Sequence, residues 1–269
     1  MNGIIINIDP AALHLGSFEL RWYSVAIAIA VFAGIAIAIR EANRKGLNAD
    51  NIYSLLPWLL IAGLVGARLF HVIDQWGYYS ANPWEIVQVQ HGGLAIWGAL
   101  VAGGITVIAY ARLAHIPLGR LLDVMVPALL TAQIIGRIGC IINGDAYGGI
   151  TNLPWAFIYV HPNTMIPSSL VGVPTHPYPV YEMLWNGLTL ALVIKFRHLL
   201  TKDGHLFLGY LLFYSLGRLA FTFVRQENTL FWVFQQAQVL AIAILIISVA
   251  IILYQVLKAK RAITIAGRL

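Results

Sequence analysis

The sequence predicts an all-α, polytopic integral membrane protein with about seven transmembrane helices. Of its 269 residues, 59% are hydrophobic and only 10% are charged, and the mean hydropathy is +0.78. Soluble domains average about 45–50% apolar and about 25% charged residues, so this composition excludes a soluble globular protein and a disordered chain. A single cysteine excludes an internal disulfide and a cysteine-rich metal cluster.

Seven segments are apolar and long enough to cross a bilayer, which takes about 20 helical residues. They are residues 20–39, 52–73, 91–111, 121–141, 180–196, 205–224 and 233–256. We expect them to form a single integral membrane domain over residues 1–269. Two polar segments, 74–90 and 142–179, join spans on the outer side, and the aromatic residues of the first suit the membrane interface.

Taken in order, the spans differ in what interrupts their apolar pattern. The first three carry small residues at a four-residue spacing, which permits close helix contacts. These residues are Ala30, Gly34 and Ala38, then Gly63 and Ala67, then Gly98 and Ala102. The fourth span ends in a glycine-rich run, and the fifth begins beside two prolines. The sixth carries a tyrosine and an arginine on one face, and the seventh leads into a basic tail.

The formal net charge of +6 is distributed unevenly between the two sides of the predicted membrane. Twelve of the 17 basic residues lie in connections on one side and in the C-terminal tail. They are Arg40, Arg44, Lys45, Arg112, Arg120, Lys195, Arg197, Lys202, Lys258, Lys260, Arg261 and Arg268. Only Arg21 and Arg225 lie on the other side. Since cytoplasmic loops are enriched in Lys and Arg, the N-terminus is expected outside and the C-terminus inside, and no nucleic-acid partner is expected.

The remaining three arginines lie in or near the apolar segments: Arg68, Arg137 and Arg218. A charge at mid-bilayer costs at least about 2.5–3.5 kcal/mol, so each needs a partner. Arg68 either snorkels to the surface or pairs with Asp74, Arg137 pairs with Asp145 or Glu182, and Arg218 pairs with Glu182. The alternative is an anion from outside the chain. A lipid phosphate fits, because guanidinium groups bind phosphate bidentately.

Four further motifs carry polar groups into the membrane. His91, Gly92 and Gly93 open the third span, where the glycines would let an anion approach the amides of a helix N-terminus. His91 otherwise only caps or is solvated. The run 136–149 contains Asn143, Gly144 and Asp145, and it predicts backbone that leaves the helix to line a polar cavity.

The segment from His176 to Glu182 leads back into the bilayer and places His, Tyr and Glu within one turn of the start of the fifth span. In the sixth span, Tyr214 and Arg218 are four residues apart and share one face, and Arg225 is expected on the same stripe.

Together these motifs resemble the bacterial phosphatidylglycerol–prolipoprotein diacylglyceryl transferase family, in order and over essentially the whole chain. Tyr23 resembles the family's tyrosine at the start of the first span. Cys140, Asp145 and Thr222 depart from the family's pattern, because many members carry Asn, Glu and Glu there. Without a carboxylate at Thr222, Glu182 is the alternative partner for Arg218.

The resemblance implies transfer of the diacylglyceryl group of phosphatidylglycerol to the lipobox cysteine thiol of prolipoproteins. A thioether forms and glycerol phosphate leaves, as the first step of bacterial lipoprotein maturation. No cofactor or metal is implied. The expected partners are phosphatidylglycerol, prolipoprotein signal peptides and membrane lipids. The expected location is the bacterial cytoplasmic membrane, multi-pass, with the active site toward the outer leaflet.

The resemblance also assigns roles to residues. His91, Arg137 and Arg218 are the candidate catalytic residues: His91 as a base for the thiol, and the arginines as stabilisers of phosphate charge. Which group takes the thiol proton stays open. The candidate substrate-binding residues are Tyr23, Gly92, Gly93, Asn143, Gly144, Asp145, Gly148, His176, Tyr181, Glu182, Tyr214 and Arg225. The alternative functions are a lipid or small-anion transporter and an inactive lipid-binding paralogue.

Overall fold

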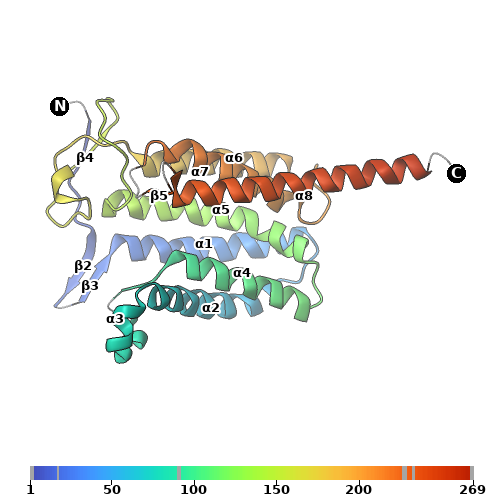
Figure 1. Ribbon diagram of the computed structural model, residues 1–269, viewed down its shortest axis with the longest axis horizontal. Helices are drawn as coiled ribbons and strands as arrows, with labels where there is room; N and C mark the ends of the chain where they lie inside the picture. Colours follow the sequence, from blue (N-terminus) through green and yellow to red (C-terminus); the bar gives the residue numbers. More distant parts are fainter. Residues whose placement is uncertain (1–2, 17, 90–91, 226–228, 232–233, 267–269) are drawn as a thin grey trace. The chain divides into compact units, whose positions relative to one another are not determined.

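The structure is a computed structural model that describes residues 3–16, 18–89, 92–225, 229–231 and 234–266. Within these ranges the chain is mostly helical, with eight α-helices (Figure 1). They are α1 (Trp22–Arg44), α2 (Asp50–Asp74), α3 (Trp76–Ala81), α4 (Ile96–Leu113), α5 (Leu118–Asn143), α6 (Tyr178–Phe196), α7 (His205–Thr222) and α8 (Gln236–Ala266). Each of the seven predicted spans therefore coincides with a helix.

Five of these helices are long and apolar enough to cross a membrane: α1, α2, α4, α5 and α8, where the crossing window in α8 is Gln238–Gln255. Helices α6 and α7 fill the other two predicted spans but are less apolar. Glu182, Asn186 and Lys195 lower the mean hydropathy of α6, and Arg218 lowers that of α7. Because of these polar residues, the two helices are also candidates for contributing side chains to an active site.

The expectation of an all-α chain was wrong in one respect, because short strands form outside the long helices. They are β1 (Ile4–Ile6), β2 (Ala11–Leu15), β3 (Phe18–Arg21), β4 (Phe157–Tyr159), β5 (Thr229–Phe231) and β6 (Phe234–Gln235). Strand β1 pairs in parallel with β4, while β2 with β3 and β5 with β6 form antiparallel pairs. Two 3₁₀ helices, η1 (Pro83–Val87) and η3 (Ser168–Leu170), lie in the two polar connections.

Helix boundaries also differ from those expected. Helix α4 begins at Ile96 instead of residue 91, because Gly92 and Gly93 adopt φ of +87° and +74°, which a right-handed helix does not accommodate. Helix α5 continues through the glycine-rich run to Asn143, α7 ends at Thr222, and α8 continues beyond residue 256 to Ala266.

The contacts of the chain divide it into two compact units, residues 38–124 and residues 1–37 together with 125–269. In the smaller unit, α2 and α4 pack antiparallel: Gly66 lies against Gly98, while the Tyr110 hydroxyl lies 3.4 Å from the Asn51 side chain at the other end. A Cβ on Gly98 would overlap the Gly66 carbonyl. The close contact thus uses Gly66 and not the expected Gly63, which has no neighbour within 4 Å.

In the larger unit, α6 packs on α7 and α7 on α8 (Figure 1). An apolar core joins α5, α6 and α7 through Val126, Leu130, Val193, Leu206 and Tyr210. A second core beside β4 contains Phe157, Tyr159 and Ile166. The helices thereby bring the C-terminal end of α5 next to the start of α6 and the end of α7. The single-domain organisation over residues 1–269 stays a prediction.

Candidate active site

The end of α5 is shaped by one glycine. Gly144 has φ +77°, and its N–H donates to the Cys140 carbonyl at 2.9 Å, which stops the helix after Asn143. A Cβ there would overlap the Thr164 hydroxyl and lie 3.3 Å from the Tyr159 ring. The backbone therefore leaves the helix at Gly144, within the run 136–149 where the sequence predicts that it leaves, although α5 ends two residues beyond the predicted end of the span.

This geometry fixes the side chain of Asn143, which is only 5% exposed. Its Nδ2 lies 3.1 Å from the Met165 sulfur, and its backbone carbonyl accepts a hydrogen bond from the Met165 N–H at 2.9 Å. The Asn143 Oδ1 atom is buried without a hydrogen-bond partner among the described residues. Asp145, in contrast, is exposed. Asn143 is therefore rigidly placed at the polar end of α5.

A cluster of charged side chains joins α5, α6 and α7. Glu182 on α6 forms an ion pair through Oε2 with Arg137 on α5. Its other oxygen, Oε1, lies 3.0 Å from Nη1 of Arg218 on α7. Both arginines thus pair with Glu182, one of the two alternatives expected for Arg137. The Glu182 side chain is 11% exposed, so two guanidinium groups share one poorly hydrated carboxylate, and the three side chains together carry one excess positive charge.

Tyr178 completes this cluster and was missed by the sequence analysis. Its side chain is fully buried, its hydroxyl donates to Glu182 Oε1 at 2.7 Å, and that hydroxyl accepts from Arg218 Nη1 at 2.8 Å. The guanidinium carbons of Arg137 and Arg225 lie 5.9 and 5.1 Å from the centre of its ring. The signal that could have found it is the four-residue spacing from Glu182, which places both residues on one helix face.

Gly148 lies in the segment after α5, where it contacts the segment that precedes α6 and the segment that follows α7. Its N–H donates to the His176 carbonyl at 3.1 Å, and it forms a β-bridge with Arg225. A Cβ would lie 2.7 Å from the His176 Cβ and 2.9 Å from the Val224 carbonyl. Arg225 therefore lies in a loop beyond the end of α7, and the expectation that it continues the stripe of Arg218 was wrong.

His176 and Tyr181 form a second polar contact beside α6. The Nδ1 atom of His176 lies 3.2 Å from the Tyr181 hydroxyl, which also accepts from Trp155 Nε1 at 3.0 Å. Partial burial lowers the pKa of His176 below its ordinary value. Since that ordinary value is about 6.5, the imidazole is neutral at pH 7 and serves as a hydrogen-bonding group.

The two remaining tyrosines of the expected site lie on α1 and α7. Tyr23 is 38% exposed at the start of α1, where Gly139 allows close approach: a Cβ on Gly139 would lie 3.1 Å from the Tyr23 Cα. Tyr214 packs against the apolar core of α5, α6 and α7, with its ring centre 5.9 Å from that of Tyr210. Tyr210 accepts a hydrogen bond from Gln133 at 2.8 Å, one turn before Arg137 on α5.

The His91 motif belongs to the smaller unit. His91 itself lies outside the described residues. Gly92 and Gly93 precede α4 instead of opening it, so they do not form the expected helix N-terminus. Arg68 is 7% exposed, and it neither snorkels nor pairs with Asp74. Its guanidinium donates to the carbonyls of Gly92 and Gly93 at 2.7 and 3.0 Å.

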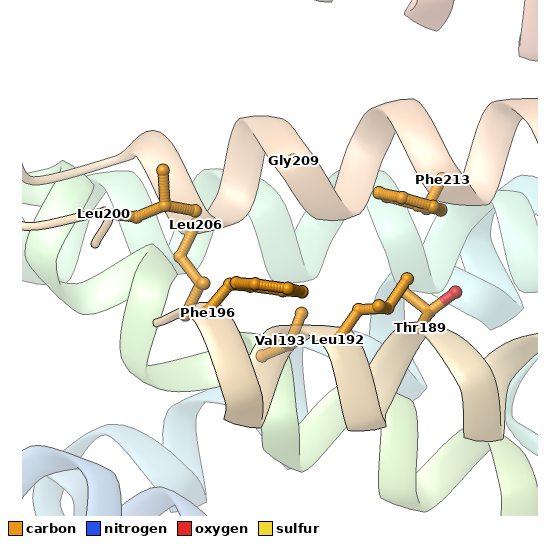
Figure 2. A pocket seen from close by; sticks show the side chains of 8 residues that line it. All are labelled: Thr189, Leu192, Val193, Phe196, Leu200, Leu206, Gly209 and Phe213. Atoms are coloured by element: carbon orange, nitrogen blue, oxygen red, sulfur yellow. The ribbon is translucent and has the colours of Figure 1, made fainter. Parts of the chain in front are cut away.

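An apolar pocket of about 180 Å³ lies between α6, α7 and the connection between them (Figure 2). Its lining is hydrocarbon apart from Thr189, whose hydroxyl donates to the Trp185 carbonyl at 2.8 Å. The pocket lies along α6 and α7 on the far side of Thr189 and Phe213 from Glu182 and Arg218. It lacks the charged groups of the cluster, and no group of three or more potential metal ligands occurs within the described ranges.

The long apolar helices and the charged cluster at the ends of α5, α6 and α7 define a multi-pass membrane protein with positive charge held among its helices. The family model of prolipoprotein diacylglyceryl transferases matches residues 10–254. The chain belongs to this family, and it is a membrane-bound transferase of lipoprotein biosynthesis. The family expected from the motifs is thereby confirmed.

Relatives that carry the name of this transferase cover the chain almost completely. A phosphatidylglycerol–prolipoprotein diacylglyceryl transferase of Listeria monocytogenes serotype 4b is 35% identical over 252 residues, which is 93% of this chain and 91% of the relative. That of Lactiplantibacillus plantarum is 35% identical over 259 residues, 95% of this chain and 92% of the relative. That of Lysinibacillus sphaericus is 31% identical over 266 residues, 97% of each.

Proposed function

We propose that this transferase moves the diacylglyceryl group of phosphatidylglycerol onto the lipobox cysteine of a prolipoprotein. The thiol sulfur attacks the glyceryl carbon that carries the phosphate. A C–S bond forms, the C–O bond to phosphate breaks, and the phosphate leaves as glycerol phosphate. The thiol proton passes to a base. The observation that carries this proposal is the Arg137–Glu182–Arg218 cluster.

The positive charge and the hydrogen-bonding geometry of the two arginines match the phosphate group that leaves in the reaction. The phosphate changes from a diester to a monoester during the reaction and gains negative charge in the transition state. Arg137 and Arg218 would stabilise that charge, because the guanidinium fork binds phosphate through two parallel hydrogen bonds. Glu182 and Tyr178 hold Arg218 in place before substrate arrives. Donors that are already oriented need little reorganisation as charge develops.

The thiol must lose its proton to become a good nucleophile, since the free thiol has a pKa of about 8.5. His91 is the candidate base, because an unperturbed imidazole is mostly neutral at pH 7. Its neighbours Gly92 and Gly93 are held by Arg68. Asn143, Tyr23 and Tyr214 are the candidate ligands of the lipid head group, as groups that donate or accept hydrogen bonds.

The remaining candidate substrate-binding residues surround the cluster from its outer side. Gly148, His176 and Arg225 meet beside Tyr178, and Tyr181 shares a polar contact with His176. Gly144 and Asp145 follow Asn143 at the end of α5. These contacts support a polar lining that receives the glycerol and phosphate groups.

The proposed topology places the N-terminus outside, the C-terminus inside and the site toward the outer leaflet. Two structural features support it. The antiparallel packing of α2 and α4 gathers the basic connections 40–51 and 112–120 at one end of that unit. In the other unit, Glu182 lies at the start of α6 and Arg218 near the end of α7, away from the basic connection 197–204. Positive charge marks the cytoplasmic side.

The direct test incubates the purified protein with phosphatidylglycerol and a lipobox peptide, and then measures the peptide mass. The expected result is a gain of one diacylglyceryl group, and a peptide with Ser in place of the lipobox Cys should gain nothing. Lipid binding without any adduct would identify an inactive lipid-binding paralogue. Lipid movement between leaflets without an adduct would identify a transporter.

A further inference from the structure

The apolar pocket between α6 and α7 has a lining that suits hydrocarbon and not a polar ligand (Figure 2). Phe196 lines it from α6, and Leu206 and Phe213 line it from α7. Thr189 is the polar member of the lining, but its hydroxyl already donates to the Trp185 carbonyl at 2.8 Å. Apolar cavities of about 150 Å³ stay dry and bind small hydrocarbons. A pocket of about 180 Å³ therefore fits part of a hydrocarbon chain.

The space in the pocket depends on a glycine of α7. Gly209 lines the pocket, and a Cβ there would have no neighbour within 4 Å. Farther along the same pair of helices, the indole of Trp185 covers Gly217. The two helices thus pack tightly at one glycine and leave a gap at the other. Phe196, which lines the gap, is 41% exposed, so the pocket opens onto the surface of the molecule.

Basic side chains lie at the same end of α6 as the pocket. The Lys195 ammonium lies 5.4 Å from the centre of the Phe196 ring. Leu200, in the connection to α7, lines the pocket two residues before Lys202. Both lysines are exposed, and Asp203 is the acidic side chain next to Lys202. Clusters of basic residues next to a membrane helix attract anionic lipid head groups, and lysine side chains extend toward them.

The length of α6 places the pocket and the charged cluster at different depths. The helix has 19 residues and is about 28 Å long at 1.5 Å per residue, which nearly matches the hydrocarbon core of a bilayer, about 30 Å. Glu182 lies in its second turn and Phe196 is its last residue. These two residues are about 21 Å apart along the helix, whereas the hydrocarbon of one leaflet is about 15 Å deep. An acyl chain that starts at Glu182 would therefore end before Phe196.

We propose that this pocket binds one acyl chain of an anionic phospholipid from the leaflet opposite the charged cluster, with the lipid phosphate at Lys195 and Lys202. This lipid is a second lipid, distinct from the substrate. Its chain fills the gap at Gly209 and stabilises the packing of α6 on α7, the helices that carry Glu182 and Arg218. The proposal rests on the predicted span of α6 and does not depend on transfer activity.

The experiment uses a photoreactive phosphatidylglycerol that carries a diazirine in one acyl chain. The purified full-length protein is placed in phosphatidylcholine nanodiscs with a small fraction of this probe and irradiated, and the labelled residues are identified by mass spectrometry. Labelling at Ile105, a 62% exposed residue of α4, measures ordinary contact with bilayer lipid. A photoreactive phosphatidylcholine with the same chains tests the head group.

Two sets of variants test the chain and the charge separately. In Gly209→Leu the new side chain enters the pocket. Gly187→Leu is the matched control, because Gly187 is also a helical glycine with open space around its Cβ position but does not line the pocket. The double variant Lys195→Gln with Lys202→Gln removes the proposed phosphate contacts and leaves the pocket unchanged. Thermal unfolding checks that each variant is folded.

The expected result for the wild-type protein is strong labelling of residues 189–213 by the phosphatidylglycerol probe, relative to Ile105. Gly209→Leu should lower this ratio by about tenfold or more, as expected when at least two methylene groups are no longer buried, and Gly187→Leu should keep it. The double lysine variant, and the change to the phosphatidylcholine probe, should each lower it by about fivefold or more. The KM for phosphatidylglycerol should stay within about twofold of the wild type in Gly209→Leu.

Three outcomes would overturn the inference. Equal labelling of residues 189–213 in the wild type and in Gly209→Leu would show that the pocket holds no chain. Equal labelling by the two probes would identify ordinary boundary lipid that is not selected by charge. A raised KM in Gly209→Leu for long-chain but not short-chain phosphatidylglycerol would mean that the substrate's own chain occupies the pocket. If Gly209→Leu did not fold, the lysine variant and the two probes would still decide whether an anionic lipid binds here.

Discussion

At the scale of single residues, Glu182 holds the candidate site together, because two arginines from different helices share its carboxylate. Removing one partner of a buried ion pair is costly, since the other charge is left unpaired. The arrangement therefore keeps Arg137 and Arg218 in fixed positions, even though neither lies on the helix that carries Glu182. Tyr178 adds a hydroxyl that bonds to Glu182 and Arg218.

Replacement of either arginine by lysine should lower activity by about 10²-fold or more, although the charge is kept. Lysine cannot reproduce the bidentate fork, and such a loss corresponds to about 2.7 kcal/mol of transition-state stabilisation. The measurement is kcat for Arg137→Lys and Arg218→Lys with fixed lipid and peptide, with Arg40→Lys, at an exposed position of α1, as control. Wild-type rates in either variant would reduce that arginine to a structural role.

His91→Gln should lose activity at pH 7 and recover it as pH rises toward about 8.5, the ordinary pKa of a thiol. Glutamine keeps a hydrogen bond but cannot take a proton, and at high pH the thiolate forms without a base. The arginine variants should not recover, because their missing group does not titrate in this range. The measurement is the pH–rate profile of all three variants. Equal, pH-independent losses would leave His91 as a positioning residue only.

At the scale of elements, α7 shows how two glycines in one helix have different roles. Gly217 lies against the indole of Trp185, which donates to the Phe213 carbonyl at 2.8 Å and holds α6 on α7. Gly209 lines the apolar pocket, and a Cβ there would have no neighbour within 4 Å. One glycine is thus required by close packing and the other is not.

Gly217→Ala should therefore lower the unfolding temperature, because overpacking a close contact costs about 1–3 kcal/mol. Gly209→Ala should keep or raise it, since the added methyl enters open space and alanine favours helix over glycine by about 1 kcal/mol. Thermal unfolding in one detergent, followed by tryptophan fluorescence, measures both. Equal shifts in the two variants would mean that the α6–α7 contact around Trp185 is loose.

At the scale of the whole molecule, the charge distribution predicts how the chain lies in the membrane. The basic connections gather at one end of each unit, and the charged cluster lies at the other end of α6 and α7. Cytoplasmic loops are enriched in Lys and Arg, so we predict that these basic ends lie on the cytoplasmic side.

Cysteine labelling in intact cells tests this orientation. Asn152→Cys should react with a membrane-impermeant maleimide added outside, whereas Lys202→Cys should react only after the membrane is permeabilised. Both positions are exposed, and the native Cys140 is buried. The unaltered chain is the control for background labelling. The reverse pattern would contradict the outer-leaflet location of the site.

The sequence by itself determined the helical membrane class, the seven helical segments, the family and the identity of most candidate site residues. Hydropathy and motif spacing are local properties, so they can be read without knowing which segments meet. Segment ends were less accurate, because glycines such as Gly92 and Gly144 adopt positive φ only where their neighbours require it.

Only the tertiary structure decided the partners of the buried charges. From sequence, a carboxylate and a lipid phosphate were both acceptable partners for an arginine in a membrane helix, and a backbone carbonyl was not considered. In the folded chain, Arg137 and Arg218 both pair with the Glu182 carboxylate, and the Tyr178 hydroxyl accepts a hydrogen bond from Arg218. Arg68 instead donates to backbone carbonyls, among them that of Gly92. These choices depend on which helices pack together, because a charge in a low-dielectric interior pairs with whatever group the packing brings within reach.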